Sequence, residues 1–276
     1  MSVINTNIGA LKAANASSQA NKALGTAMER LSTGKRINSA KDDAAGLAIA
    51  TSMTSQIRGM NQGIRNANDG ISLAQTAEGA LNEASNMLQR IRELSVQAAS
   101  GTYKETDRTN LQAEVDQLTE QLDQLVSNTE FNGVKLFDGT VTEVSIQAGA
   151  KATDAVTLTM ADLSDLAAVG GAAGSYDVSG ADGTAATATI ADVDAELEAI
   201  STARATLGAG QSRLESAVNT LSNNATNLSD ARSRIEDTDY SAETTALAKA
   251  QILSQASTAM LSQANQSQQN VLSLLR

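Results

Sequence analysis

The amino-acid sequence predicts a mainly α-helical protein, with a long helical coiled-coil bundle formed by N- and C-terminal segments and a small β-hairpin region in the middle. Apolar residues recur at steps of three, four and seven near both ends, which is the spacing of helices that pair along a narrow stripe. None of the 276 residues is proline, so nothing interrupts a long helix. Aromatic residues make up only 2% of the chain, which indicates a core of aliphatic side chains between closely packed helices.

The first helix is expected over residues 3–32, where apolar positions keep a seven-residue phase. Gly34 follows, and a glycine just past a helix end commonly stops the helix. Ser39, with Asp42 three residues on, resembles a capping box, and Asp43 adds favourable charge near a new N-terminus. These signals predict that a second helix begins here.

Two further helices are expected before residue 130. One runs over 44–100, and the other covers 106–128, where apolar residues alternate steps of four and three. Gly59 and Gly63 in the former have the spacing of a membrane dimer motif. Arg58 beside them excludes a lipid setting, so we expect close helix packing at these glycines.

Residues 131–190 lose the helical period and are expected to be β-rich. Glycine-containing turn dipeptides separate short alternating runs, as in hairpins. The local signals are two tight turns at Asn132-Gly133 and Asp138-Gly139, two short strands at 141–146 and 155–160, and a surface loop at 170–183.

The strongest periodic signal predicts a helix over 195–235. Six branched aliphatic residues stand at strict seven-residue intervals, and so long a stripe needs long neighbours. The helices at 44–100 and 106–128 can supply them within the same chain. The stripe consists of Ile200, Leu207, Leu214, Leu221, Leu228 and Ile235.

The last helix is expected over 241–275 and differs in kind. Small and amide side chains dominate it, and between Ser241 and Leu275 only Glu243 and Lys249 are charged. Such a helix buries little apolar area per turn, against an ordering entropy of about 1–2 kcal/mol per residue. We therefore hypothesise that both chain ends are poorly ordered in the monomer and fold together on assembly.

The composition argues against several functional classes. Because Cys and His are absent, the chain has no thiolate nucleophile and lacks the two ligands that zinc prefers, so we expect neither an enzyme nor a cofactor. A net charge of −11 without a basic stripe argues against nucleic acid. No apolar stretch is long enough to span a bilayer, and no cleavable signal peptide is recognisable, so export requires another route.

Two acidic clusters are candidates for a metal site: Asp42 with Asp43, and Glu236 with Asp237 and Asp239. Neither lies in a loop like that of an EF-hand. Helix capping or a solvated joint is the favoured interpretation of both.

Motifs at both ends of the chain resemble bacterial flagellin. The N-terminal motifs are Ile4-Asn-Thr-Asn7, Glu29-Arg-Leu-Ser-Thr-Gly34, Arg36-Ile-Asn-Ser-Ala40 and Asp42-Asp-Ala-Ala-Gly-Leu-Ala-Ile49. The C-terminal motifs are Ala231-Arg-Ser-Arg-Ile-Glu-Asp237, Gln251-Ile-Leu253, Gln263-Ala-Asn-Gln266 and Val271-Leu-Ser-Leu-Leu275. Periodicity alone indicates only a helical assembly protein.

The resemblance implies a structural subunit that polymerises into the flagellar filament, the propeller of swimming bacteria. Residues 1–43 and 236–276 would form its inner tube, and 44–235 a rod with β-hairpins; the short middle leaves no room for large outer domains. Inner-tube assembly is assigned to Val3, Ile4, Ile8, Leu11, Leu24, Leu31, Leu253, Met260, Ala264, Val271 and Leu274. The rod core is assigned to Leu88, Ile91, Leu111, Val115, Leu118, Leu122, Ile200, Leu207, Leu214, Leu221, Leu228 and Ile235.

The resemblance also implies partners. These are further copies of the chain, a flagellar export chaperone, the filament cap and hook–filament junction proteins. Arg90, Leu94 and Glu114 match a region that Toll-like receptor 5 recognises in many flagellins. The alternative, purely structural interpretation of these charges is a solvated or salt-bridging helix face.

Two alternatives remain at this point. A hook–filament junction protein would share the same terminal helices but would not grow into a long filament. A coiled-coil signalling module would share the seven-residue repeats, but it would need a membrane anchor or a symmetric hairpin, and the sequence indicates neither.

Overall fold

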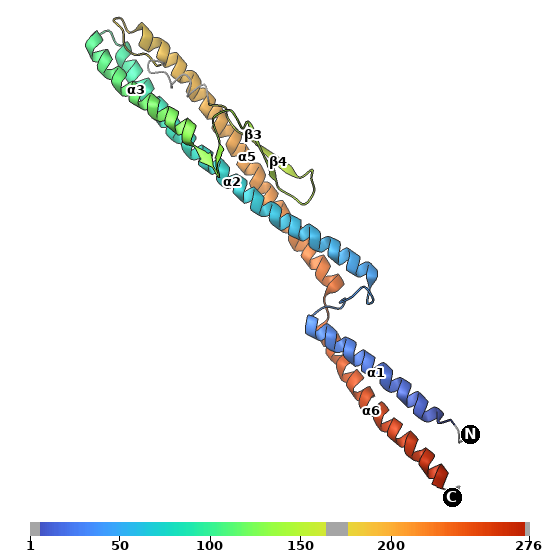
Figure 1. The fold of residues 1–276 in the computed structure, drawn as a ribbon. Coiled ribbons are helices and arrows are strands. Elements are labelled where there is room, and N and C mark those ends of the chain that lie inside the picture. Colours follow the sequence, from blue (N-terminus) through green and yellow to red (C-terminus); the bar gives the residue numbers. More distant parts are fainter. Residues whose placement is uncertain (1–5, 164–175, 274–276) are drawn as a thin grey trace. The chain divides into compact units, whose positions relative to one another are not determined.

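The computed structural model describes residues 6–163 and 176–273, with side chains up to residue 269. This part of the chain is mainly helical, which confirms the predicted fold class (Figure 1). Its helices are α1 (Ile8–Thr33), α2 (Ala44–Ala99), α3 (Glu105–Asn128), α5 (Thr184–Glu236) and α6 (Tyr240–Ser273). Its strands are β1 (Glu130–Phe131), β2 (Val134–Lys135), β3 (Glu143–Gln147) and β4 (Ala155–Thr159).

Contacts divide the chain into two units, and each is described by itself below. The first comprises 1–55 and 226–276, and the second comprises 56–225. The domain boundaries expected at 43/44 and 235/236 remain a prediction.

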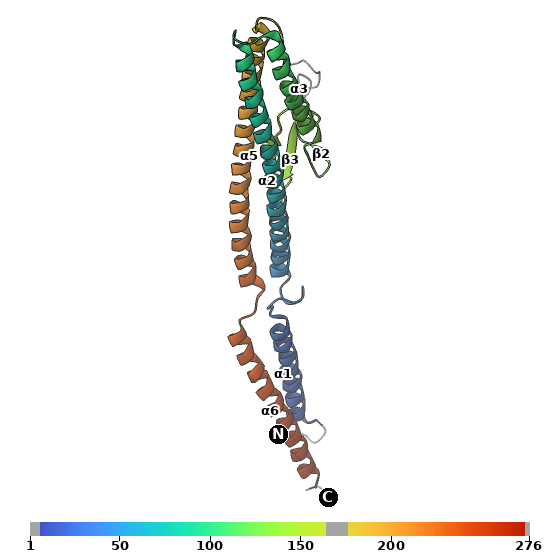
Figure 2. The same ribbon diagram turned by 90° about the vertical axis from the view of Figure 1, so that its left-hand side faces the viewer.

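In the first unit, α1 and α6 lie side by side and antiparallel (Figures 1 and 2). Helix α1 begins later than predicted, because the side chain of Asn7 accepts a hydrogen bond from the N–H of Ala10 at 3.0 Å and caps the helix just before Ile8. Residues 3–5 of the expected helix lie outside the described residues. The glycine stop is confirmed: Gly34 has a φ of 72°, and its N–H donates to the carbonyl of Arg30.

Helix α2 begins at the expected residue but with a different cap. The carboxylate of Asp43 accepts a hydrogen bond from the N–H of Gly46 at 2.8 Å. Ser39 and Asp42 form one of the two hydrogen bonds of the predicted capping box, because the carboxylate of Asp42 accepts the N–H of Ser39, and that of Asn38 as well. This hydrogen bond lies in the turn before α2 and not at the helix N-terminus, so the predicted position of the cap was wrong. These hydrogen bonds, the one from Ser39 first, lower the pKa of Asp42.

The second unit packs α2, α3 and α5 around an aliphatic core (Figure 2). Leucine, isoleucine, valine and alanine fill most of it, and two rings, Phe137 and Tyr176, are each 1% exposed. Desolvation in this core raises the pKa of Tyr176, and the nearby carboxylates of Glu196 and Asp192 raise it further. The predicted core of small and aliphatic side chains is therefore what the helices enclose.

Two antiparallel hairpins follow α3. Strands β1 and β2 form a short pair around Asn132, whose φ of 50° suits the tight turn predicted there. Strands β3 and β4 pair from Glu143 opposite Thr159 to Gln147 opposite Ala155. Strands β3 and β4 confirm the strands predicted at 141–146 and 155–160 within a residue or two, whereas for β1 and β2 only the turn between them was predicted.

The β-rich segment ends earlier than predicted, because α5 starts at Thr184 and not at residue 195. The carboxylate of Asp182 accepts the N–H of Thr184, and Ala186, Thr189 and Val193 are buried at helical spacing. The sequence alternates Ala and Thr here, which resembles a strand. Residues 170–175 of the expected loop lie outside the described residues.

Gly59 and Gly63 of α2 pack against a loop and not against another helix. A Cβ on Gly63 would lie 2.8 Å from the backbone nitrogen of Gly149, and one on Gly59 would lie 2.8 Å from the Cβ of Ala150. The predicted helix packing at these glycines was therefore wrong. They form a notch for the turn between β3 and β4.

Candidate assembly surface

The seam between α1 and α6 is narrow and built from small side chains. Ala20 and Ala27 of α1 and Ala250 and Ser257 of α6 are its most buried residues, at 9% exposure or less. Larger side chains are only half-buried, at steps of three and four along each helix. The seam residues are Ala13, Ser17, Ala20, Leu24, Ala27 and Leu31 on α1, and Leu247, Ala250, Ser254, Ser257, Leu261 and Ala264 on α6.

Polar contacts also join α1 and α6 at several positions along this narrow seam. The side-chain amide of Asn7 donates to the carbonyl of Ala264 at 3.0 Å, and the hydroxyl of Ser254 donates to the side-chain oxygen of Asn21 at 2.8 Å. Arg30 and Glu243 pair at 3.7 Å. Hydrogen bonds thus fix the register of a pair that buries little apolar area.

Large apolar side chains lie exposed on the same two helices. Each keeps between 47% and 66% of its surface exposed within the described chain. A soluble protein tolerates single exposed apolar residues, whereas larger groups of exposed apolar side chains are typical of interaction surfaces. We call this set the exposed apolar set; it consists of Ile8, Leu11 and Met28 on α1 and Ile252, Leu253 and Met260 on α6.

The structure places the predicted inner-tube residues in three groups. Ile8, Leu11, Leu253 and Met260 belong to the exposed apolar set, whereas Leu24, Leu31 and Ala264 lie half-buried in the seam. Val271 lies in α6 beyond the described side chains. Val3, Ile4 and Leu274 lie outside the described residues.

Sequence reasoning missed Met28 and Ile252. Met28 follows the seam residue Ala27, so it points roughly 100° around the helix from that position. Ile252 lies two residues from both Ala250 and Ser254, so it points roughly 200° from each of them, away from the seam. An apolar residue outside the predicted stripe was the available signal for both.

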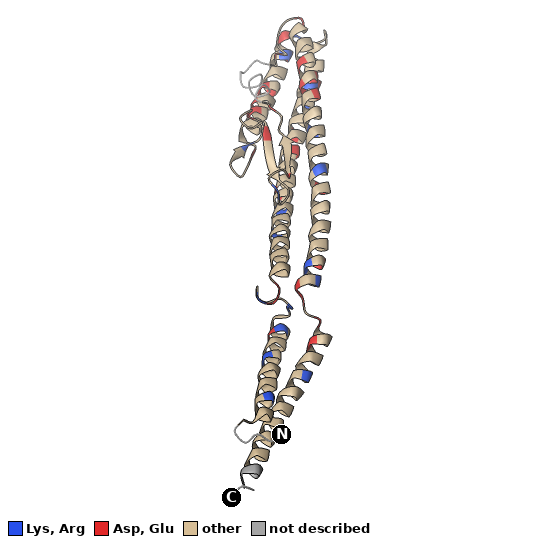
Figure 3. Cartoon of the chain, turned by 90° about the vertical axis from the view of Figure 1, so that its right-hand side faces the viewer, with Lys and Arg blue, Asp and Glu red and all other residues tan. Residues whose placement is uncertain are grey.

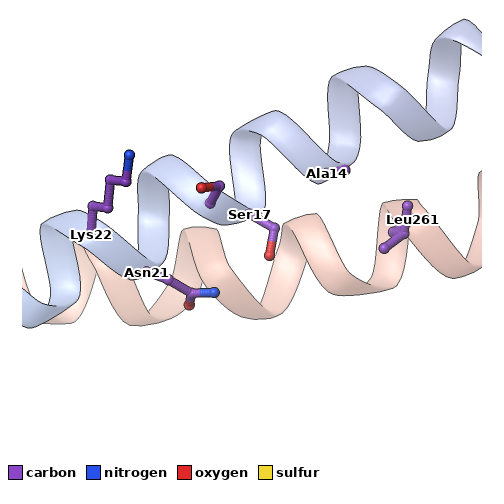
Figure 4. A pocket seen from close by; sticks show the side chains of 6 residues that line it. Ala14, Ser17, Asn21, Lys22 and Leu261 are labelled. Carbon is purple, nitrogen blue, oxygen red and sulfur yellow. The ribbon is translucent and has the colours of Figure 1, made fainter.

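A shallow groove interrupts the α1–α6 surface (Figure 4). Its volume is about 540 Å³. It exists because Ala14 and Ser17 are too short to fill the space beside Leu261. Ser18, Asn21 and Lys22 complete its lining.

The connecting segments 34–39 and 235–240 hold each other by hydrogen bonds. The N–H of Arg36 donates to the carbonyl of Glu236 at 2.6 Å, and the N–H of Thr238 donates to the carbonyl of Gly34 at 3.0 Å. The ammonium of Lys35 lies 2.6 Å from the carboxylate of Glu236. Glu236, one of the residues considered for a metal, is thus engaged by a lysine.

The predicted rod-core residues divide by depth. Leu88, Ile91, Val115, Leu122, Ile200, Leu207 and Leu214 are buried in the second unit, and Leu111, Leu118 and Leu221 are partly buried there. Leu228 and Ile235 are half-buried in the first unit.

Ion pairs join the helices of the second unit on its surface. The guanidinium of Arg90 contacts Glu114 of α3 at 2.7 Å and Glu93 at 3.1 Å, and that of Arg92 contacts Asp194 of α5 at 2.6 Å. Glu114 first, then Glu93, raises the pKa of Arg90, and Arg92 lowers that of Asp194. Leu94, in contrast, is 1% exposed and faces the core.

Few charges lie on α1 and α6 (Figure 3). Their described residues carry four basic side chains against two acidic ones, although the whole chain is strongly acidic. The basic residues are Lys12, Lys22, Arg30 and Lys249, and the acidic ones are Glu29 and Glu243.

Among the described residues, no three acidic side chains converge to hold a metal ion. In that same part of the chain, no helix is both long and apolar enough to cross a membrane.

Two family models match most of the chain. One, described as the bacterial flagellin N-terminal helical region, matches residues 4–142, and the other, the bacterial flagellin C-terminal helical region, matches residues 190–275. The flagellin of Halalkalibacterium halodurans is 47% identical over 250 residues, which cover 91% of each chain. The flagellin of Bacillus subtilis is 46% identical over 302 residues, which cover 99% of each chain.

A solved structure shares the fold at low identity. It is described as a flagellar hook-associated protein from Vibrio parahaemolyticus, and it superposes with a TM-score of 0.60 at 14% identity, covering 71% of this chain and 100% of that one. The far more similar relatives are flagellins, so the junction-protein and signalling alternatives are not favoured. The chain belongs to the bacterial flagellin family and is a structural subunit of the extracellular flagellar filament.

Proposed function

We propose that α1 and α6 make the contacts that join neighbouring subunits in the filament, through the exposed apolar set. Residues 1–43 and 236–276 then form the inner tube, and 44–235 form the rod domain. The observation that carries the proposal is the contrast between the seam, which buries small residues, and the large apolar side chains left exposed on the same helices.

The energetics favour a partner for this surface. Burying a large aliphatic side chain contributes about 1.5–3 kcal/mol. The few charges on α1 and α6 keep the electrostatic cost of bringing two such surfaces together low, because desolvating a charge is expensive. Contacts between unlike faces of identical subunits repeat without closing, so they generate an open helical polymer.

The thin seam also supports coupled folding of the two ends. The α1–α6 pair gains little from its own burial, so further burial against neighbouring subunits supplies the free energy that orders it.

Further partners are proposed from the family. The export chaperone binds the C-terminal helix before assembly, and the cap and junction proteins contact the ends of the filament. The chain leaves the cell without a cleaved signal peptide, and its role is structural, not catalytic. Receptor recognition by Toll-like receptor 5 is assigned to Arg90 and Glu114, whose side chains are about half exposed; Leu94 supports them from the core.

Seeded filament growth tests the assembly proposal on the full chain. Leu253→Glu should leave helical circular dichroism unchanged, because the side chain is 47% exposed, but should stop elongation from short filament seeds. Val134→Glu is the matched control: its side chain is 41% exposed but lies in the second unit, and it should elongate as the unchanged chain does. Electron microscopy distinguishes tubes from monomers.

Normal elongation of Leu253→Glu would contradict the assigned surface. If the unchanged chain itself stayed monomeric on its own seeds, the junction-protein alternative would return.

A further inference from the structure

The methionines of this chain differ sharply in exposure. Met28 is 57% exposed and Met260 62%, whereas Met160 is 3% exposed in the core of the second unit. Met53, Met60 and Met87 are partly buried, and Met1 lies outside the described residues. The two most exposed methionine side chains described thus lie on α1 and α6.

Exposure decides which thioethers react with a peroxide. The thioether sulfur attacks one peroxide oxygen, the O–O bond breaks, and the sulfur keeps that oxygen as a sulfoxide while the other leaves as water. The sulfur loses two electrons and the peroxide gains two. Cysteine is absent from the sequence, so no thiolate of the same chain competes for the oxidant.

We propose that Met28 and Met260 are oxidation sites of the free subunit, and that sulfoxide formation at them withdraws the subunit from filament growth. The first half rests on exposure alone. The second rests on the proposed assembly surface, to which both side chains belong.

The sulfoxide changes the property that the surface depends on. An unbranched apolar side chain becomes a polar one with a strong hydrogen-bond acceptor, and burying that group without a donor is unfavourable. The reverse also holds: a thioether covered by a neighbouring subunit is shielded from peroxide. Oxidation therefore discriminates between free and assembled subunits.

The test exposes purified full-length monomer and preformed filaments to dilute hydrogen peroxide and maps sulfoxide by peptide mass spectrometry. In monomer, Met28 and Met260 should oxidise several-fold faster than Met160. In filaments their oxidation should slow markedly. Equal rates at Met160 would overturn the assignment of the sites.

Elongation from untreated seeds tests the second half. At steady state, the concentration of unpolymerised subunit should be at least about tenfold higher for oxidised than for untreated monomer. This factor corresponds to the loss of burial of a single methionine side chain. For each variant, elongation of treated monomer is divided by elongation of the same variant without peroxide. This ratio should stay near one for the double variant Met28→Leu, Met260→Leu, whereas for Met160→Leu it should fall as far as it does for the unchanged chain. The single leucine variants serve if the double variant grows poorly.

A leucine variant that elongates but stays peroxide-sensitive would overturn the assembly half. Failure of the untreated, unchanged chain to elongate would instead count against the proposed assembly function, and the sulfoxide map would still decide the assignment of the sites.

Discussion

Alanine substitution of two glycines in one helix should change stability in opposite directions. Gly63 and Gly79 both lie in α2, where alanine is favoured over glycine by about 1 kcal/mol. At Gly79 no atom beyond the adjoining backbone of α2 itself lies within 4 Å of the added Cβ, so Gly79→Ala should stabilise by roughly that amount. At Gly63 the Cβ would lie 2.8 Å from the nitrogen of Gly149 and 3.0 Å from the carbonyl carbon of Ala148.

The clash at Gly63 involves backbone that is tied in place. The N–H of Ala148 donates to the carbonyl of Asp154 at 2.9 Å, and the side-chain amide of Asn66 donates to the carbonyl of Gln147 at 3.0 Å. Overpacking costs about 1–3 kcal/mol, which exceeds the gain in helix propensity. Gly63→Ala should therefore destabilise by about 1 kcal/mol net.

Scanning calorimetry of both full-length variants measures the difference. In a unit of this size, about 1 kcal/mol corresponds to a Tm change of about 2–4 °C, upward for Gly79→Ala and downward for Gly63→Ala. Hydrogen exchange should also accelerate over β3 and β4 in Gly63→Ala alone. Tm shifts of the same sign in both variants would refute the notch as the reason for glycine at residue 63.

Three further predictions concern side chains of the two units. Arg108 is 1% exposed, and its guanidinium donates hydrogen bonds to the carbonyls of Ala98, Ser100, Gly180 and Ala181. Arg108→Met leaves these carbonyls without donors and should lower the free energy of unfolding by about 2–4 kcal/mol. Hydrogen exchange should accelerate at 98–101 and 180–183, and Arg108→Lys should restore part of the protection. Because the pKa of Asp42 is lowered in the folded chain, its carboxylate stabilises the fold above the ordinary carboxyl pKa of about 3.9. This stabilisation is lost as the pH falls through the lowered pKa. The melting temperatures of Asp42→Asn and the unchanged chain should therefore differ at neutral pH and converge in acid. Arg92→Ala should leave the urea midpoint of unfolding almost unchanged, because both partners of its ion pair with Asp194 are about half exposed and water screens their attraction. A clear fall in the midpoint would contradict the assignment of this pair as a weak surface ion pair.

The sequence predicted those elements whose signal is local or strictly periodic. The glycine after α1, the turn at Asn132 and the seven-residue phase of α5 each follow from backbone preference or from repeated burial on one side. The early start of α5 was missed because alternating Ala and Thr look alike in a strand and in a helix whose small residues pack inward. The cap of α2 was expected at the pair Ser39 and Asp42 but lies at Asp43, because both aspartates are competent acceptors of backbone N–H groups.

The seam of α6 shows a different limit. Two stripes run along this helix: one contains Leu247 and Leu261, and the other contains Leu253 and Met260. Their apolar content is similar, so periodicity does not distinguish the stripe that meets α1 from the one left exposed. Only the placement of α1 separates them, and that depends on contacts between residues far apart in the chain.

The hydrogen bond between Asn7 and Ala264 joins residues 257 positions apart. Such a contact cannot form while either end of the chain is still inside a narrow channel or still being made. Whichever end emerges first has to wait for the other, and closing a loop of that length from an unstructured chain costs about 5 kcal/mol of entropy. Pairing of α1 with α6 is therefore delayed until both ends of the chain are free, because the two helices come from opposite ends of the sequence.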